Sequence, residues 1–255
     1  MSFIEKTTIS IIKQLMRTDK QKAKQLIEVA HSRRGTLAHL RAAVKKRQKE
    51  ADFSFSQSGE DMVLSAFFQE NYKGFYVDIG ANHPLRFSNT YHFYLKGWRG
   101  LNIDAGPGFM RIFDQMRPGD INIGMAVGRQ GTEEFFMFEE PCYNTFDREI
   151  ADEVMEKNLS RLSKTFQIKK LPLSEIMDNY LLEGQRIDFL SVDCEGLDLE
   201  ILESNNWDRY RPEFICSECH DSFDNTQTGA LGFLLGKGYR LVAKTKLSEI
   251  YRLLG

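Results

Sequence analysis

The stretch GFYVDIGANHP, residues 74–84, decides the fold of this chain. Its first half is a short, β-rich apolar run, which stops at an acid, Asp78, followed by a glycine, Gly80. The residues from 88 to 98, SNTYHFYLKGW, then have the pattern of a helix. A strand, a turn and a helix in succession form the unit from which open α/β sheets are built.

β-rich runs and helical segments alternate in the same way along the rest of the chain. The runs that predict strands of one sheet are residues 74–80, 100–106, 120–128, 187–196, 212–221, 239–245 and 248–254. Residues 133–140 alternate like an additional edge strand, and the stretch from 141 to 172 is predicted to be helical. This order predicts a Rossmann-like, doubly wound, mostly parallel sheet of seven strands with helices on both faces.

Acidic residues mark the ends of four predicted strands. They are Asp78, Asp104, Asp193 and Glu218. The carboxyl ends of parallel strands meet at one edge of a sheet, which is where such folds bind their ligands. Because neighbouring carboxylates repel one another, we expect a cationic ligand, a set of hydroxyl groups or a metal ion between them.

The turn after the first strand indicates which cofactor binds there. A dinucleotide loop has the spacing G-x-G-x-x-G, whereas Gly80 is followed by Asn82 and Pro84. Pro84 has no N–H to offer a pyrophosphate, and the anionic Asp78 would repel one. Asp78 and Asp104 together suit S-adenosylmethionine, which carries a positive amine, a sulfonium and two ribose hydroxyls. The alternative is that Asp78 and Gly80 only close a strand-to-helix turn.

Five segments, in order, resemble the FkbM-type S-adenosylmethionine-dependent methyltransferases. They are SQSGEDMVL (56–64), YVDIGANHPLRFSNT (76–90), GWRGLNIDAGP (97–107), RPGDINIGMAVG (117–128) and IDFLSVDCEGLDLEIL (187–202). The resemblance covers about residues 54–220 and implies a sheet of the class I methyltransferase type. It also implies O-methylation of a sugar or a related small polar building block of a polysaccharide or natural product.

The resemblance implies a set of cofactor-binding residues as well. They are Gln57, Glu60, Asp61, Asp78, Gly80, Asn82, Asp104, Asp120, Ala126 and Asp193. The first three would close over the cofactor from the N-terminal side, and Asp120 and Ala126 would flank the adenine. Alternatives stay open for two segments: SQSGED also fits a helix cap built on Ser58 and Asp61, and Asp120 also fits an ordinary turn. The family pattern has Glu-Pro where this chain has DAGP (104–107), which leaves the ribose contact of Asp104 open.

Methyl transfer to an alcohol requires alignment of the acceptor oxygen and removal of its proton. In one route His220 is the general base, oriented by Asp193 or Glu218. In the other, Asp193, Glu218 and His220 bind Mg²⁺ or Mn²⁺, which acidifies the acceptor hydroxyl. The metal route is preferred by analogy with related small-molecule methyltransferases. Residues 142–147, CYNTFD, fall where an acceptor loop could lie, with Tyr143 and Asn144 as candidates.

The segment FICSECHD (214–221) has the C-x-x-C-H spacing of a c-type haem site. Strand alternation places Cys216, Glu218 and His220 on one side and Cys219 on the other. Because the two thiols would point apart, we expect a strand that delivers Glu218 and His220 to the crevice. Haem attachment, a zinc site and a redox dithiol are the rejected alternatives.

Charge divides the chain near residue 53. Residues 1–50 hold 13 Lys or Arg and four acids, while the whole 255-residue chain has a net charge of −2. This predicts a basic helical extension over residues 1–53 and a methyltransferase domain over residues 54–255. Packing of the basic helices on that domain or in a homo-oligomer is favoured over a membrane surface. They lack the interleaved aromatic residues of a nucleic-acid platform.

Composition limits the class of protein. The chain is 42% hydrophobic and 27% charged, with no run approaching the roughly 20 apolar residues that span a bilayer. With no signal segment, this predicts a cytoplasmic enzyme with reduced thiols. Two other functions stay open. One is an NAD-dependent oxidoreductase or epimerase, although the glycine-rich loop of such enzymes is missing after Gly80. The other is a non-catalytic binding module, although the presence of Asp78, Asp104 and Asp193 argues against it.

Overall fold

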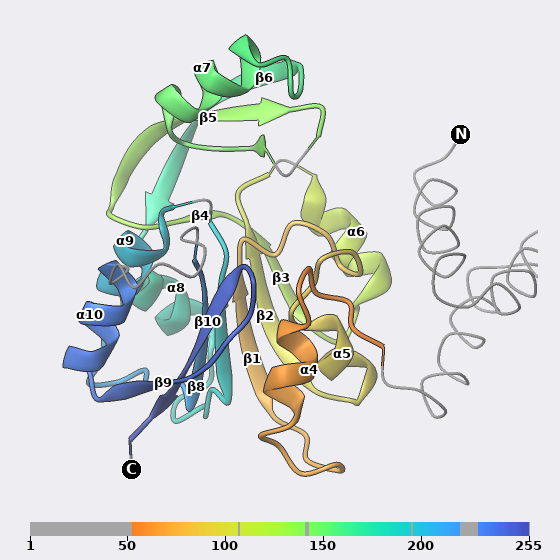
Figure 1. The fold of residues 1–255 in the computed structure, drawn as a ribbon, viewed down its shortest axis with the longest axis vertical. Coiled ribbons are helices and arrows are strands. Elements are labelled where there is room, and N and C mark those ends of the chain that lie inside the picture. The colour runs from red at the N-terminus through yellow and green to blue at the C-terminus, as the bar shows by residue number, and fades with distance from the viewer. Residues whose placement is uncertain (1–52, 107, 141–142, 195, 220–228, 255) are drawn as a thin grey trace, which may run out of the picture. The chain divides into compact units, whose positions relative to one another are not determined.

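A computed structural model describes residues 53–106, 108–140, 143–194, 196–219 and 229–254. The predicted helices of the basic extension lie outside these residues, and so does His220. The boundary near residue 53 therefore stays a prediction. The described part confirms the α/β fold class, with a seven-stranded, mostly parallel sheet between layers of helices (Figure 1).

The main sheet has the strand order β3-β2-β1-β7-β8-β10-β9. The first five strands in this order are parallel, and β10 runs antiparallel to both of its neighbours. The bounds are β1 (Phe75–Ile79), β2 (Arg99–Asp104), β3 (Ile121–Gly124), β7 (Phe189–Val192), β8 (Phe214–Glu218), β9 (Tyr239–Lys244) and β10 (Ser248–Leu253). The chain adds β2 and β3 on one side of β1 and later adds β7 on its other side, so the order of succession reverses between β1 and β7. Sheets of this kind bind their ligands at such a point.

Helices cover both faces of the sheet. Figure 1 shows one group of helices on one side and a second group on the other. They are α4 (Glu60–Ser65), α5 (Tyr91–Leu95) and α6 (Phe109–Met116), and opposite them α8 (Leu173–Tyr180), α9 (Asp198–Glu203) and α10 (Gly229–Gly236). None of the helices in the described residues is both long and apolar enough to cross a bilayer.

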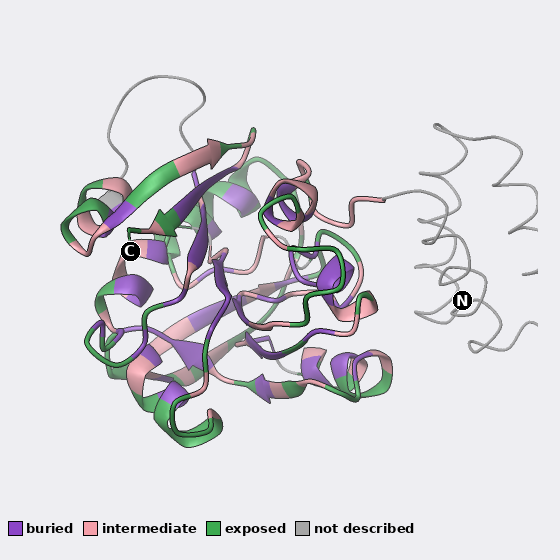
Figure 2. Ribbon diagram, turned by 90° about the horizontal axis from the view of Figure 1, so that it is seen from below, coloured by how far each residue is buried: buried purple, intermediate pink, exposed green. Residues whose placement is uncertain are grey.

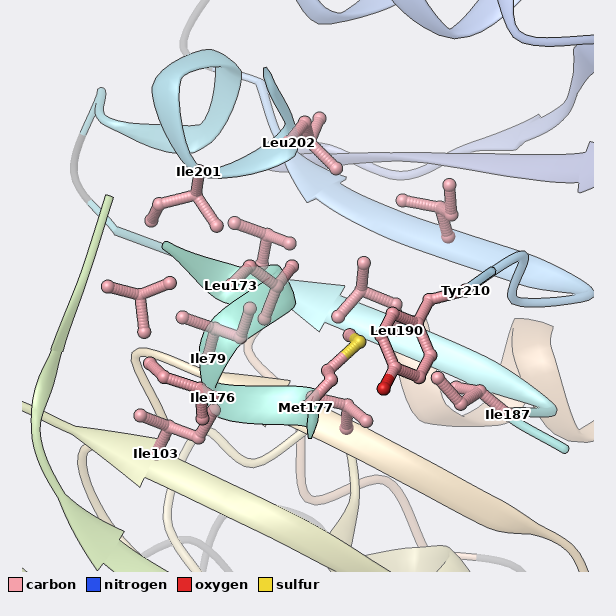
Figure 3. Packing of buried hydrophobic residues seen from close by; sticks show 14 of the residues in the cluster. Ile79, Ile103, Leu173, Ile176, Met177, Ile187, Leu190, Ile201, Leu202 and Tyr210 are labelled. Atoms are coloured by element: carbon pink, nitrogen blue, oxygen red, sulfur yellow. The ribbon is translucent and has the colours of Figure 1, made fainter. Parts of the chain in front are cut away.

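Strand alternation divides the buried residues into two cores. Val77 and Ile79 face an aliphatic core with Leu190 and Met177, shown from close by in Figure 3. Tyr76, which directly precedes Val77 in the sequence, faces a second and more aromatic core. Figure 2 shows the buried residues running along the central strands and the exposed ones on the outer surfaces of the helices. Burial on both faces explains why the parallel strands are short, continuous apolar runs.

The region from residue 126 to residue 171 differs from the prediction. The predicted strand 120–128 ends as β3 at Gly124, and β4 (Ala126–Val127) enters a second sheet of order β4-β6-β5. β5 (Gly131–Phe138) lies in this small sheet and not at an edge of the main one, and the stretch predicted to be helical contains α7 (Arg148–Glu156) and β6 (Leu162–Leu171). Most of β6 is exposed or half-exposed, so its sequence lacks the apolar run that marks the core strands.

Candidate active site

A cavity of about 110 Å³ lies at the carboxyl ends of β1, β2 and β7. Predicted site residues from separate segments line it: Gln57, Gly80, Asn82, Asp104 and Asp193, together with Asn144 of the predicted acceptor loop. Its apolar lining includes Phe109, Met125, Ala126, Phe135 and Phe146. No lysine or arginine is among the described residues of this lining, so the cavity offers no cation to a diphosphate.

Gly80 allows the close approach of two strand ends at this cavity. Its φ is +76°, and a Cβ atom there would lie 1.9 Å from the carbonyl oxygen of Asp193. The N–H groups of Gly80 and Ala81 both donate to the carbonyl oxygen of Ile103, at 3.0 and 3.1 Å. A side chain at residue 80 would therefore force β1 and β7 apart at the point where the cavity begins.

Asp104 is held in the cavity wall by the backbone. Its two carboxylate oxygens accept hydrogen bonds from the N–H groups of Asn82 (2.8 Å) and Gly106 (2.6 Å). Asn82 has a φ of +47°, in the left-handed region that Asn tolerates better than most residues. Burial raises the pKa of Asp104, although the two backbone N–H groups oppose this effect. A carboxylate fixed in this way is suited to accept further hydrogen bonds from a pair of hydroxyl groups.

A second, smaller hollow of about 10 Å³ adjoins the first cavity. Three residues line both spaces: Gln57, Phe87 and Asp193. Glu60 and Glu218 are among the other lining residues of the hollow. Asp193 and Glu218 thus meet at one place, as their positions at the ends of β7 and β8 predicted.

Comparison with known proteins identifies the family. The Methyltransferase FkbM domain matches residues 78–241, which is more than half of the chain. The chain belongs to this family. The protein is therefore an S-adenosylmethionine-dependent methyltransferase, and neither the oxidoreductase nor the non-catalytic alternative is supported.

Several solved methyltransferases resemble the enzyme at low sequence identity. Methyltransferase FkbM from Methylobacillus flagellatus KT is 12% identical with a TM-score of 0.45, over 96% of this chain and 59% of that one. A putative O-methyltransferase from Klebsiella pneumoniae is 9% identical with a TM-score of 0.45, over 96% and 100%. The O-methyltransferase from Bacillus cereus, solved in complex with SAH, is 10% identical with a TM-score of 0.41, over 96% and 100%. No curated protein matches the sequence.

Not every predicted cofactor residue of the methyltransferase lines the cavity. Asp78 is only 4% exposed and accepts a hydrogen bond of 2.6 Å from the hydroxyl of Thr90. Burial raises the pKa of Asp78 to about 6, against the effects of Thr90 and Arg117. Asp78 therefore fixes Thr90 at the start of the next helix, and its contact with the cofactor stays a prediction.

Asp120 lies far from the expected adenine position, which corrects the prediction. It precedes β3, at the amino-terminal edge of the sheet, and its N–H donates to the carbonyl of Arg117 in a turn. Its carboxylate accepts hydrogen bonds from the hydroxyl of Tyr76 (2.6 Å) and the N–H of Gly100 (3.0 Å). The ordinary-turn alternative is therefore right, and Ala126 alone of this pair lines the cavity.

The segment before α4 is organised by Asp61 and lies beside the cavity. Asp61 is fully buried, and its carboxylate accepts hydrogen bonds from the hydroxyls of Ser54 (2.7 Å) and Ser56 (2.9 Å) and the N–H of Phe55 (2.7 Å). The helix cap expected at Ser58 is absent from α4. Asp61 thus shapes the segment that brings Gln57 to the cavity.

Glu60, the neighbour of Asp61, connects α4 to the opposite end of the domain sequence. One of its carboxylate oxygens accepts a hydrogen bond of 2.6 Å from Thr245, in the turn between β9 and β10. The other accepts from the N–H of Ser58 at 2.8 Å. The side chain is 1% exposed, so Glu60 fixes one wall of the hollow.

Arg117 is a residue of the site region that the sequence analysis missed. Its guanidinium is fully buried and donates to the carbonyl of Pro84 (2.9 and 2.6 Å) and to the hydroxyls of Ser88 (2.7 Å) and Thr90 (2.7 Å). The rings of three aromatic residues lie within 5.7 Å of it. Arg117 thereby holds the loop that carries Asn82. The only signal in the sequence was its place at the start of the family segment 117–128, and an arginine there is equally compatible with an exposed position.

The cysteines do not form a redox or metal motif in the described residues. Cys216 packs in the aromatic core, Cys219 follows the end of β8, and Cys194 lines the cavity, and these three form no disulfide among the described residues. Burial raises the pKa values of Cys194 and Cys216 well above the ordinary thiol value. Protonated, buried thiols are poor nucleophiles and poor metal ligands.

The predicted metal site is not supported by the described part of the chain. No group of three His, Cys, Asp or Glu side chains there is placed to hold a metal ion. Asp193 and Glu218 supply two carboxylates, while His220 lies outside the described residues.

Proposed function

We propose that the enzyme transfers the methyl group of S-adenosylmethionine to a hydroxyl group of a sugar or a related small polar acceptor. The observation that carries this proposal is the pair of adjoining spaces that share Gln57, Phe87 and Asp193. One has the polar and aromatic lining of a nucleoside site, and the other is lined by carboxylates that can accept hydrogen bonds from hydroxyl groups.

The larger cavity fits the cofactor. Asp104 would accept hydrogen bonds from the ribose hydroxyls, and the aromatic rings of Phe109, Phe135 and Phe146 would contact the adenine. When bound, the cofactor supplies a sulfonium methyl group. The absence of basic side chains from the described lining suits a cationic cofactor better than a diphosphate.

The smaller hollow has room for about one water-sized group and is the proposed place of the acceptor hydroxyl. Asp193 and Glu218 would orient the acceptor hydroxyl toward the cofactor cavity. The new carbon–oxygen bond replaces the carbon–sulfur bond, S-adenosylhomocysteine leaves, and the hydroxyl proton passes to a base. His220, or a divalent metal held by Asp193, Glu218 and His220, are the two proposed means of removing that proton.

Calorimetric titration with S-adenosylhomocysteine tests the cofactor site. Asp104→Ala should weaken binding at least tenfold, because charge-assisted hydrogen bonds contribute about 1.5–3 kcal/mol each. Asp120→Ala is the matched control, because it removes a carboxylate that is half-buried like that of Asp104 from the opposite edge of the sheet, and it should leave the affinity within about threefold in folded protein. Equal losses in both variants, or no binding by the parent, would overturn the cofactor assignment.

Methyl transfer to a panel of hydroxylated sugars tests the acceptor class. Chelator treatment followed by Mg²⁺ or Mn²⁺, on the parent and on Glu218→Gln, separates the two routes. Activity that survives the chelator but is lost in His220→Asn supports the general base. Activity restored only by metal, and lost in Glu218→Gln, supports the metal route.

A further inference from the structure

Four arginines line an open groove of about 570 Å³ at the edge of the main sheet away from the active site. Arg186 and Arg211 precede β7 and β8, Arg240 lies at the start of β9, and Arg252 lies near the end of β10. Because β10 is antiparallel, all four positions fall at the amino-terminal edge of β7 and β8. The cofactor cavity opens at the carboxyl edge, so the groove is a separate surface.

The groove carries a clear excess of positive charge. Glu213 is the single acid among the described residues that line it, so the lining has a charge of +3 from four arginines and one glutamate. Glu213 accepts from both Arg186 and Arg252, the latter at 3.2 Å. This shared carboxylate holds two guanidinium groups close to each other.

Most of the guanidinium N–H groups remain available to a ligand. Each guanidinium has five N–H donors. Arg211 donates one hydrogen bond, to the carbonyl of Lys237 (2.8 Å), and Arg186 contacts Asp188 (2.9 Å) in addition to Glu213. The side chain of Arg240 forms no hydrogen bond or ion pair with the described residues. Like charges gathered on one groove repel one another unless an anion lies between them.

We propose that this groove binds a phosphate group. The planar, bidentate guanidinium matches phosphate oxygens better than a point charge does, and several arginines with free donors are typical of phosphate recognition. The phosphate belongs either to a soluble phosphorylated compound or to a phospholipid headgroup, and both present the same oxygens to the four side chains.

The test compares two double variants of equal charge in the full chain. Arg240→Gln/Arg252→Gln removes two groove charges, and Arg111→Gln/Arg161→Gln removes two exposed charges elsewhere, on α6 and before β6. Inorganic pyrophosphate, measured by calorimetry, probes a soluble ligand. Sedimentation with phosphatidylcholine vesicles, with and without phosphatidylglycerol, probes a headgroup. The basic residues 1–50 are the same in all variants, so their contribution cancels.

The groove variant should bind at least one probe tenfold more weakly than the parent, while the control variant stays within about twofold. Loss in the pyrophosphate arm assigns a soluble ligand, and loss in the phosphatidylglycerol arm assigns a headgroup. Arg240→Gln alone should reproduce part of the loss and leave the melting temperature within about 2 °C of the parent's, because this exposed side chain has no hydrogen bond or ion pair with the described residues to lose. Equal binding by the two double variants in both arms, or no binding by the parent, would overturn the proposal.

Discussion

Replacing Arg117 with methionine tests the account of the cofactor loop most directly. Methionine keeps most of the length and apolar contact of the side chain but removes every hydrogen bond of the guanidinium. Arg117 makes five such bonds, two of them to the carbonyl of Pro84 and the others to Ser88, Thr90 and Asn102. The variant should therefore lose both stability and cofactor affinity.

The magnitude follows from burial. Removing one partner of a buried charged network costs about 3–5 kcal/mol, less than the sum of the separate hydrogen bonds because the guanidinium no longer has to be desolvated. At about 2–4 °C per kcal/mol for a domain of this size, the melting temperature should fall by about 12 °C. The loss of positive charge also raises the pKa of Asp78 further above its usual value, since Arg117 at present opposes the effect of burial.

The assay combines thermal unfolding with calorimetry at a temperature well below both melting transitions. Arg111→Met is the matched control, because Arg111 lies on the same helix, α6, but is exposed. Its melting temperature should change by less than about 2 °C. In folded Arg117→Met, affinity for S-adenosylhomocysteine should fall at least fivefold, since the loop that carries Asn82 loses its anchor. A melting temperature and an affinity equal to those of Arg111→Met would refute the reasoning.

Two further predictions concern the turn after β1. Gly80→Ala should destabilise the enzyme by about 3 kcal/mol or more, because the new Cβ meets the carbonyl of Asp193. Gly59→Ala is the control: Gly59 has a φ of +91° but open space around it, so this change should cost only about 1 kcal/mol. Equal urea midpoints for the two variants would contradict the close-approach argument. Asp78→Asn tests the pH dependence. The folded-state pKa of about 6 lies above the ordinary aspartate pKa of 3.8, so ionisation of Asp78 destabilises the fold as the pH rises through this range. The unfolding free energy of Asp78→Asn minus that of the parent should increase by about 2 kcal/mol from pH 4 to pH 7, and a constant difference would rule this out.

The sequence was most informative where a residue's environment is set by its own segment. The parallel strands are buried on both faces, so their apolar runs predicted β1, β2, β7 and β8 and the acids that follow them. β6 was missed because it is largely exposed and pairs only within a small sheet, where propensity and pattern are weak. Asp120 was predicted to lie near the adenine because it was assigned to the third strand, residues 120–128. β3 begins only at Ile121, which leaves Asp120 in the turn at the amino-terminal edge of the sheet.

What the sequence by itself determined is the order of strands and helices, the family, and the set of carboxylates that close the strands. Strand periodicity and family motifs are local, so they can be read without knowing which strand pairs with which. Only the tertiary structure decided which of those groups share a space. It brought Gln57, Asp104 and Asp193 to one cavity, bonded Asp78 to Thr90 and buried Arg117 against the loop that carries Asn82. It also gathered four arginines, distant in sequence, on one groove. Such proximity depends on sheet order and on the direction of each side chain, and these are fixed by packing between segments and not within them.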